Sequence, residues 1–197
     1  MYYTIIQHTR MNVISRYSII SSKSFKYVVT PSPDPNSIEY YKDLLFKNGI
    51  TTVIRLCVEK KYDETYLKKF GITVIDIPMD DGSVPTHEIL SKWIQIIATE
   101  IQLGKTGIAV HCRSGLGRSP LFACIGLIRF EKIDPVDAIE LIRKEIPKAL
   151  NIKQIKYICE VRIHKSYSRG RCTIMWLIWI YIFIYEFKTI YPIVWIR

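Results

Sequence analysis

Residues 107–120 have the sequence GIAVHCRSGLGRSP, which is the most informative segment of the chain. Its start is a continuous apolar run of the kind found in buried strands, and the apolar run that begins at Leu121 predicts a helix. A loop with two glycines joins them. Such a loop binds phosphate, because its N–H groups and the helix N-terminus converge on one anion-sized space. The sequence therefore predicts an anion-binding loop between a strand and a helix.

The loop begins with a thiol and ends with a guanidinium. Cys112 is followed by five residues and then Arg118. The loop amides and the helix dipole lower the pKa of the thiol, so a thiolate nucleophile persists at neutral pH. Arg118 offers a planar fork to two phosphoryl oxygens. Ser119 is expected to donate a hydrogen bond to the sulfur, and we interpret His111 as a structural neighbour rather than a general acid.

The remaining loop positions are candidates for binding the substrate phosphate. They are Arg113, Ser114, Gly115, Leu116 and Gly117. The two glycines let the backbone turn its amides inward. A dinucleotide-binding or nucleoside-triphosphate loop is excluded, because no Lys followed by Ser or Thr comes after the glycines. The five cysteines in the chain are an odd number at irregular spacing, which supports neither a disulfide framework nor a zinc site. We expect no metal and no cofactor.

A phosphate ester also needs a proton on its leaving group. Asp80 and Asp81 lie on the turn that follows a predicted strand at residues 72–79. In a parallel sheet the carboxyl ends of the strands line one crevice, so this turn is expected to face the Cys112 loop. Paired aspartates on a turn are often only solvated turn formers. Together with the loop, one of the pair becomes a candidate general acid.

From residue 25 to 164, short β-branched runs alternate with helical ones. This alternation predicts an α/β fold with a central, mostly parallel sheet flanked by helices. Thr86 and Asp134 are expected to cap helices. The predicted strands are 25–30, 51–58, 72–79 and 107–110, and the predicted helices are 37–47, 63–70, 86–103, 121–130, 135–144 and 151–162. Residues 1–24 form an N-terminal extension in this interpretation.

The sequence HCRSGLGRS resembles the signature of cysteine-dependent protein tyrosine and dual-specificity phosphatases. GITTVIRLCVEKKYDE, GITVIDIPMDDG, AVHCRSGLGRSP and ALNIKQIKYICEVR resemble segments of the phosphatases of regenerating liver, the PRL group. The resemblance runs from about residue 26 to 175. It implies a cysteine-dependent phosphatase fold, Cys112 as nucleophile, Arg118 as phosphate binder and Asp81 as general acid. It also makes Cys57 a candidate partner of the nucleophile in a reversible disulfide, although Cys57 alone reads as a buried strand residue.

Two positions depart from the family pattern. PRL enzymes usually carry Ala after the signature Arg, which slows breakdown of the phosphocysteine, whereas this chain has Ser119. Faster turnover is expected for that reason. Arg113 adds a cation within the loop, at a position that is basic in some phosphoinositide phosphatases. Both a phosphotyrosine protein and a phosphoinositide therefore stay open as substrates, and Arg113 is equally well explained as a solvated loop residue.

The C-terminal region divides into a basic stretch at 165–175 and a hydrophobic tail at 176–197. PRL proteins end in a basic stretch with a prenylation box, and Cys172 begins the box-like sequence CTIM, for which farnesyl is expected. Such a box works only at a C-terminus, so we interpret the tail as absent from the natural product. The alternative is a hydrophobic anchor, but the uncharged run from 172 to 185 has 14 residues. A helix needs about 20 to span a bilayer.

We expect a protein tyrosine phosphatase, cytoplasmic and associated with the cytoplasmic face of membranes through a prenyl group and the basic stretch. The alternative is a phosphate-loop binding module with little turnover, since PRL proteins bind the CNNM magnesium transporters. Retention of Cys112, Arg118, Asp81 and Ser119 favours the enzyme. The net charge of +10 predicts attraction to phosphate. It does not predict nucleic-acid binding, because no aromatic and basic platform accompanies it.

Overall fold

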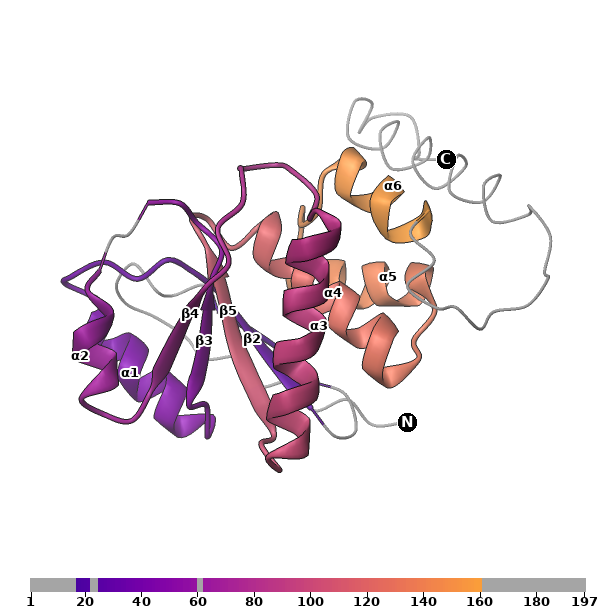
Figure 1. Ribbon diagram of the computed structural model, residues 1–197. Helices are drawn as coiled ribbons and strands as arrows, with labels where there is room; N and C mark the ends of the chain where they lie inside the picture. Colours follow the sequence, from indigo (N-terminus) through magenta and orange to yellow (C-terminus); the bar gives the residue numbers. More distant parts are fainter. Residues whose placement is uncertain (1–16, 22–24, 60–61, 161–197) are drawn as a thin grey trace, which may run out of the picture. The chain divides into compact units, whose positions relative to one another are not determined.

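The computed structural model describes residues 17–21, 25–59 and 62–160 (Figure 1). Its centre is a five-stranded sheet in the order β1-β2-β5-β3-β4. The neighbours β2 and β5, β5 and β3, and β3 and β4 are parallel, and β1 joins the β2 edge antiparallel. The predicted mostly parallel sheet is confirmed. The strands are β1 (Ser18–Ser21), β2 (Lys26–Pro31), β3 (Thr52–Arg55), β4 (Thr73–Asp76) and β5 (Gly107–Cys112).

Helices cover both faces of this sheet (Figure 1). They are α1 (Ile38–Lys47), α2 (Glu64–Lys68), α3 (His87–Gln102), α4 (Arg118–Glu131), α5 (Pro135–Glu145) and α6 (Ile152–Glu160). Side chains of α1 and α2 pack with one face, and those of α3, α4, α5 and α6 pack with the other. The molecule is therefore a three-layer α/β fold in the described region, as the alternating pattern predicts.

The central strand β5 has a nearly continuous apolar sequence, because helices cover both of its faces. Ile108 and Val110 belong to the core beneath α3 to α6, and Ala109 belongs to the core beneath α1 and α2. All six residues of β5 are buried. A strand covered on both faces needs apolar side chains at consecutive positions rather than at alternate ones. This strand delivers the chain to Cys112 at its carboxyl end.

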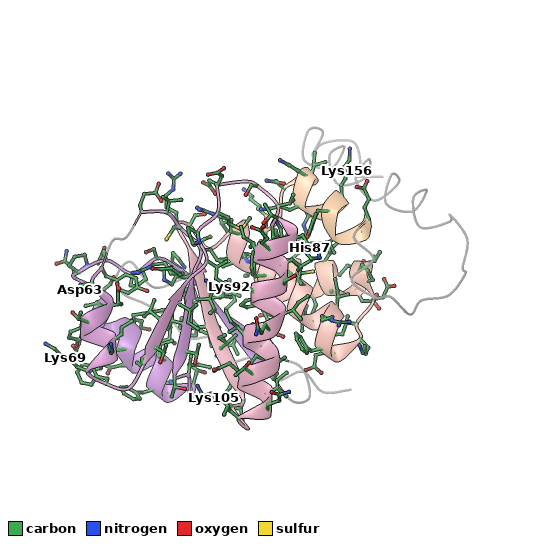
Figure 2. All side chains as sticks on the ribbon, viewed as in Figure 1. Asp63, Lys69, His87, Lys92, Lys105 and Lys156 are labelled. Carbon is green, nitrogen blue, oxygen red and sulfur yellow. The ribbon has the colours of Figure 1, made fainter. Side chains whose placement is uncertain are left out.

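Short polar side chains begin the flanking helices. The carboxylate of Asp63 accepts a hydrogen bond from the Thr65 N–H at the start of α2 (Figure 2). Thr86 caps α3 through the Ile89 N–H, and Asp134 caps α5 through the Val136 N–H. Each cap satisfies an N–H group that has no partner within its helix. The caps predicted at Thr86 and Asp134 are confirmed.

The sheet begins earlier than predicted. The sequence pattern places residues 18–21 in the N-terminal extension, but they form β1, in which Ser18 pairs with Val29 and Ser21 with Lys26. Ile20 is buried in the core beneath α3 to α6. The strand has only four residues, two of them serines, so its own sequence lacks the run of apolar residues that marks a strand. Pairing with β2 stabilises it instead.

The predictions for the C-terminal region lie outside the described residues. These are the basic stretch at 165–175, the box that begins at Cys172 and the tail at 176–197. Among the helices of the described region, none is long and apolar enough to cross a membrane.

Candidate active site

The loop of residues 113–117 connects the end of β5 to the start of α4. Gly115 has a φ of +75°, and a Cβ on it would lie 2.9 Å from the backbone nitrogen of Pro31. A side chain at this position would therefore collide with the end of β2, which explains the glycine. The loop backbone at Gly115 therefore passes very close to the backbone at the end of β2. Cys112, at the start of the loop, is 1% exposed.

The sulfur of Cys112 is surrounded by hydrogen-bond donors. The hydroxyl oxygen of Ser119 lies 3.3 Å from the sulfur, and the Gly115 N–H donates to it at 3.3 Å. Burial alone raises the pKa of this thiol, but hydrogen bonds from Ser119 and Gly115 and the charge of Arg118 outweigh it, and the net pKa is lowered. The geometry thus stabilises a thiolate, the reactive form of cysteine.

Arg118 is held at the carboxyl ends of two neighbouring strands. Its side chain is almost fully buried, and one terminal nitrogen donates to the carbonyl oxygens of Met79 at 2.9 Å and Leu56 at 3.5 Å. The Nε–H has no hydrogen-bond partner among the described residues. A buried donor without a partner is costly, so it indicates a place for a ligand oxygen. The backbone orients the guanidinium and leaves part of it for an anion.

The turn with Asp81 lies against the loop. A carboxylate oxygen of Asp81 is 3.2 Å from a terminal nitrogen of Arg118, and the other oxygen is 3.6 Å from Arg113. The side chain of Asp81 is 57% exposed and that of Arg113 is 59% exposed. The structure brings Asp81 beside the guanidinium of Arg118. The carbonyl of Asp80 accepts hydrogen bonds from the N–H and hydroxyl of Ser83, which close the turn.

His111 is fully buried behind the loop. Its Nε2 and the hydroxyl of Tyr62 share a hydrogen bond of 2.8 Å. Burial, and then the charge of Arg55, lower the pKa of His111 to about 3. The imidazole is therefore neutral at pH 7, so it supports the loop without adding a positive charge or acting as an acid.

An ion-pair cluster around the buried Arg55 supports Tyr62 in turn. Arg55 is 1% exposed, and its guanidinium binds Asp76 at 2.5 Å and Glu64 at 3.0 Å. It also lies 5.0 Å from the centre of the Tyr62 ring and donates to the Tyr62 carbonyl. Lys92 on α3 donates to the carbonyl of Asp76 at the end of β4 (Figure 2). The cluster fixes the segment that holds His111.

Cys57 follows β3 and is a buried, free thiol. Burial raises its pKa, while the charge of Arg118 lowers it, and Cys112 also acts on it electrostatically. Cys57 therefore lies within electrostatic reach of both Cys112 and Arg118. Cys124 is fully buried, and Cys159 is partly buried.

Four residues that support the site were not identified in the sequence. They are Arg55, Tyr62, Asn151 and Gln154. Asn151 and Gln154 form the N-x-x-Q pattern that can cap the N-terminus of a helix, and this pattern is a signal by which they could have been identified. No comparable signal exists for Tyr62, whose partner lies 49 residues away. Within residues 17–160, wherever the structure describes them, no group of His, Cys, Asp and Glu is arranged to hold a metal ion.

The sequence and the fold match known phosphatases. Residues 32–131 match a family model described as "Tc-R-P: Polymorphic toxin system, DSP-PTPase phosphatase". The chain is 34% identical over 161 residues to the probable protein tyrosine phosphatase type IVA B of Dictyostelium discoideum, covering 80% of this chain and 94% of that protein. The chain belongs to the PRL family of protein tyrosine phosphatases. It is a cysteine-dependent phosphatase.

This PRL-type chain is also similar to a human phosphatase and to a solved phosphatase structure. It is 35% identical to human protein tyrosine phosphatase type IVA 3, over 73% of this chain and 82% of the human protein. A solved protein tyrosine phosphatase from Leishmania major superimposes with a TM-score of 0.67 at 29% identity, covering 73% of this chain and 97% of that one. The predicted cysteine-dependent phosphatase fold is confirmed.

Proposed function

We propose that this PRL-type phosphatase hydrolyses phosphotyrosine in proteins through a phosphocysteine intermediate on Cys112. The observation that carries the proposal is the convergence of Cys112, Arg118 and Asp81 at the carboxyl ends of neighbouring strands. The thiol has a lowered pKa, and the guanidinium has an N–H donor without a partner in the part of the chain that the structure describes. These are a nucleophile and an anion binder on one loop. Asp81 supplies a proton donor beside them.

In the first step the thiolate attacks the phosphorus atom in line with the leaving oxygen. Arg118 and the loop N–H groups bind the other phosphoryl oxygens and stabilise the charge of the transition state. The incoming phosphate takes the place of the Asp81 carboxylate on Arg118. Asp81, once released from Arg118, takes up a proton from solvent and gives it to the departing tyrosine oxygen.

In the second step water attacks the phosphocysteine. Asp81, now a carboxylate, accepts a proton from the water, and the sulfur leaves as a thiolate. The Ser119 hydroxyl, 3.3 Å from the sulfur, donates a hydrogen bond to that thiolate. Ser119 therefore serves both steps, by stabilising the nucleophile in the first and the leaving group in the second.

Phosphate release from matched substrates tests the proposal. A phosphotyrosine peptide, the same peptide with phosphoserine, and vesicles that contain a phosphoinositide are compared at one pH. We expect the phosphotyrosine peptide to have the highest kcat/KM. A higher kcat/KM for the vesicles would indicate that the exposed guanidinium of Arg113 binds a headgroup phosphate. That result would contradict a protein substrate.

We expect Ser119→Ala to move the acidic limb of the kcat/KM profile to higher pH. Loss of the hydroxyl raises the pKa of Cys112, so less thiolate is present at a given pH below that pKa. Phosphocysteine hydrolysis should slow about tenfold or more, since a hydrogen bond to a charged group is lost. With phenyl phosphate as substrate, the measurements are the pH profile of kcat/KM and, by rapid mixing, the initial burst in which phenol is released ahead of phosphate. Ser91→Ala, at an exposed position on α3, is the matched control and should leave both unchanged.

The proposed cellular context extends to the membrane and to redox control. Farnesylation of Cys172 together with the basic stretch would hold the protein at an anionic membrane surface. A Cys57–Cys112 disulfide would protect the nucleophile from further oxidation. Both proposals rest on the PRL resemblance, and the electrostatic proximity of Cys57 to Cys112 supports the second.

Intact mass spectrometry of protein from its native source tests both. We expect a chain that ends at the box with a farnesyl group, and a loss of two hydrogens after mild peroxide treatment that Cys57→Ser abolishes. An unlipidated mass for all 197 residues would contradict the lipid proposal. Peroxide treatment that leaves the thiol mass unchanged would contradict the disulfide.

The binding-module alternative receives no support from the comparisons. A CNNM-type magnesium transporter remains a proposed partner on the PRL resemblance alone. The site retains the thiol, guanidinium, hydroxyl and carboxylate that hydrolysis uses, so partner binding would accompany catalysis rather than replace it.

A further inference from the structure

The start of α6 forms a reciprocal pair of side-chain hydrogen bonds. The Gln154 N–H donates to Oδ1 of Asn151 at 2.9 Å, and the Asn151 N–H donates to Oε1 of Gln154 at 3.1 Å. This is a capping box, in which two residues satisfy each other's free backbone N–H groups. Both side-chain amide oxygens are used in it. Both side-chain NH₂ groups are left to bind something else.

These NH₂ groups bind the turn that carries the candidate general acid. Nδ2 of Asn151 donates to the carbonyl of Gly82 at 3.0 Å, and Nε2 of Gln154 donates to the carbonyl of Ser83 at 3.1 Å. Gly82 and Ser83 directly follow Asp81. Gln154 is 0% exposed, so its hydrogen bond is shielded from water. Two consecutive carbonyls of the turn are thus fixed by one helix start.

The same helix start is attached to the Cys112 loop. The Leu150 N–H donates to the carbonyl of Leu116 at 3.0 Å. A Cβ added to Gly117 would lie 3.5 Å from the Gln154 amide, so the two are packed closely. Leu150 has a φ of +66°, a left-handed backbone conformation that residues other than glycine rarely adopt. Arg143 donates to the Leu150 carbonyl at 3.2 Å, which helps to hold the segment in that conformation.

Within residues 17–21, 25–59 and 62–160, the turn has few other attachments that survive substrate binding. Asp81 contacts Arg118 and Arg113, and a substrate phosphate would compete for Arg118. The hydrogen bonds of Ser83 to Asp80 lie within the turn and attach it to nothing else. The amide groups on α6 bind backbone carbonyls and use no group that binds phosphate. They can therefore hold the turn at the moment when Asp81 leaves Arg118.

We propose that Asn151 and Gln154 are positioning residues, which hold the Asp81 turn over the Cys112 loop while the proton is transferred. The proposal rests on the proposed role of Asp81 as general acid. Neither residue touches the reacting atoms. Any effect they have on the rate must therefore act through Asp81. The experiment accordingly compares a substrate whose leaving group needs a proton with one whose leaving group does not.

The first variant is Asn151→Ser. Serine still caps a helix, but its side chain is too short to reach the Gly82 carbonyl. The enzyme is assayed with phenyl phosphate, whose leaving group resembles tyrosine, and with a polyfluorinated aryl phosphate, whose leaving group departs without a proton. We expect kcat/KM for phenyl phosphate to fall about three- to tenfold, as for one lost hydrogen bond. The value for the fluorinated substrate should fall less than about twofold, since protonation no longer limits it. Asn36→Ser, at an exposed position before α1, is the matched control and should leave both values unchanged.

Gln154→Met and double variants with Asp81→Asn complete the test. Gln154→Met removes the second donor and should show the same substrate dependence. In the Asp81→Asn background, Asn151→Ser should cause no further loss with either substrate. An equal loss with both substrates, no loss at all, or a full additional loss in the double variant would overturn the positioning role. If Asp81→Asn affects both substrates equally, the proposed acid itself is overturned. Thermal unfolding of each variant separates these outcomes from a loss of the fold.

Discussion

Replacement of Cys112 by serine should reduce phosphate release from phenyl phosphate by about 10⁴-fold or more, as is typical when a covalent nucleophile is lost. The serine hydroxyl has no comparable ionised form near neutral pH, so the Gly115 N–H and Ser119 can no longer stabilise an attacking anion. Arg118 and the loop amides remain. The variant should therefore still bind inorganic phosphate while turnover is lost.

The measurement is steady-state phosphate release, with phosphate affinity determined by calorimetry. Cys159→Ser, on a partly buried position of α6, is the matched control and should retain turnover close to that of the wild-type protein. Equal rates for wild type and Cys112→Ser would show that hydrolysis does not proceed through this thiol. Loss of phosphate binding as well as turnover would point to a collapsed loop, which thermal unfolding would reveal.

The arrangement of the loop was predictable because the loop lies in one continuous stretch. A buried strand, two glycines, a cysteine and an arginine are local features, and local steric and electrostatic rules determine their arrangement. The position of the aspartate turn followed from topology, because parallel strands end at the same edge of a sheet. The ion pair between Asp81 and Arg118 is consistent with that expectation.

The supporting contacts were not predictable, because they join residues far apart in sequence. Tyr62 meets His111 across 49 residues, and Asn151 meets Gly82 across 69 residues. No local periodicity records such a pairing. The strand β1 was missed for the same reason, since its stability comes from β2 and not from its own four residues. In each case the local structure depends on a partner far away in the sequence, which the local residue pattern does not reveal.

Asp81→Asn should separate proton donation from phosphate binding. Asparagine cannot donate a proton as a carboxylic acid does, so kcat/KM for phenyl phosphate should fall about 10²- to 10⁴-fold. The fluorinated aryl phosphate should lose far less, because its leaving group needs no proton.

The same substitution should strengthen the binding of inorganic phosphate. In the resting structure the Asp81 carboxylate lies 3.2 Å from Arg118, so a phosphate must displace it. Removing this competing charge should tighten phosphate binding about two- to fivefold, the range of a partly exposed ion pair. Inhibition constants for inorganic phosphate provide the measurement, and Asp80→Asn, at the exposed neighbouring position, is the matched control. A parallel loss of turnover and phosphate affinity would instead mean that Asp81 only maintains the shape of the turn, because a proton donor that competes with substrate for Arg118 must move the two quantities in opposite directions.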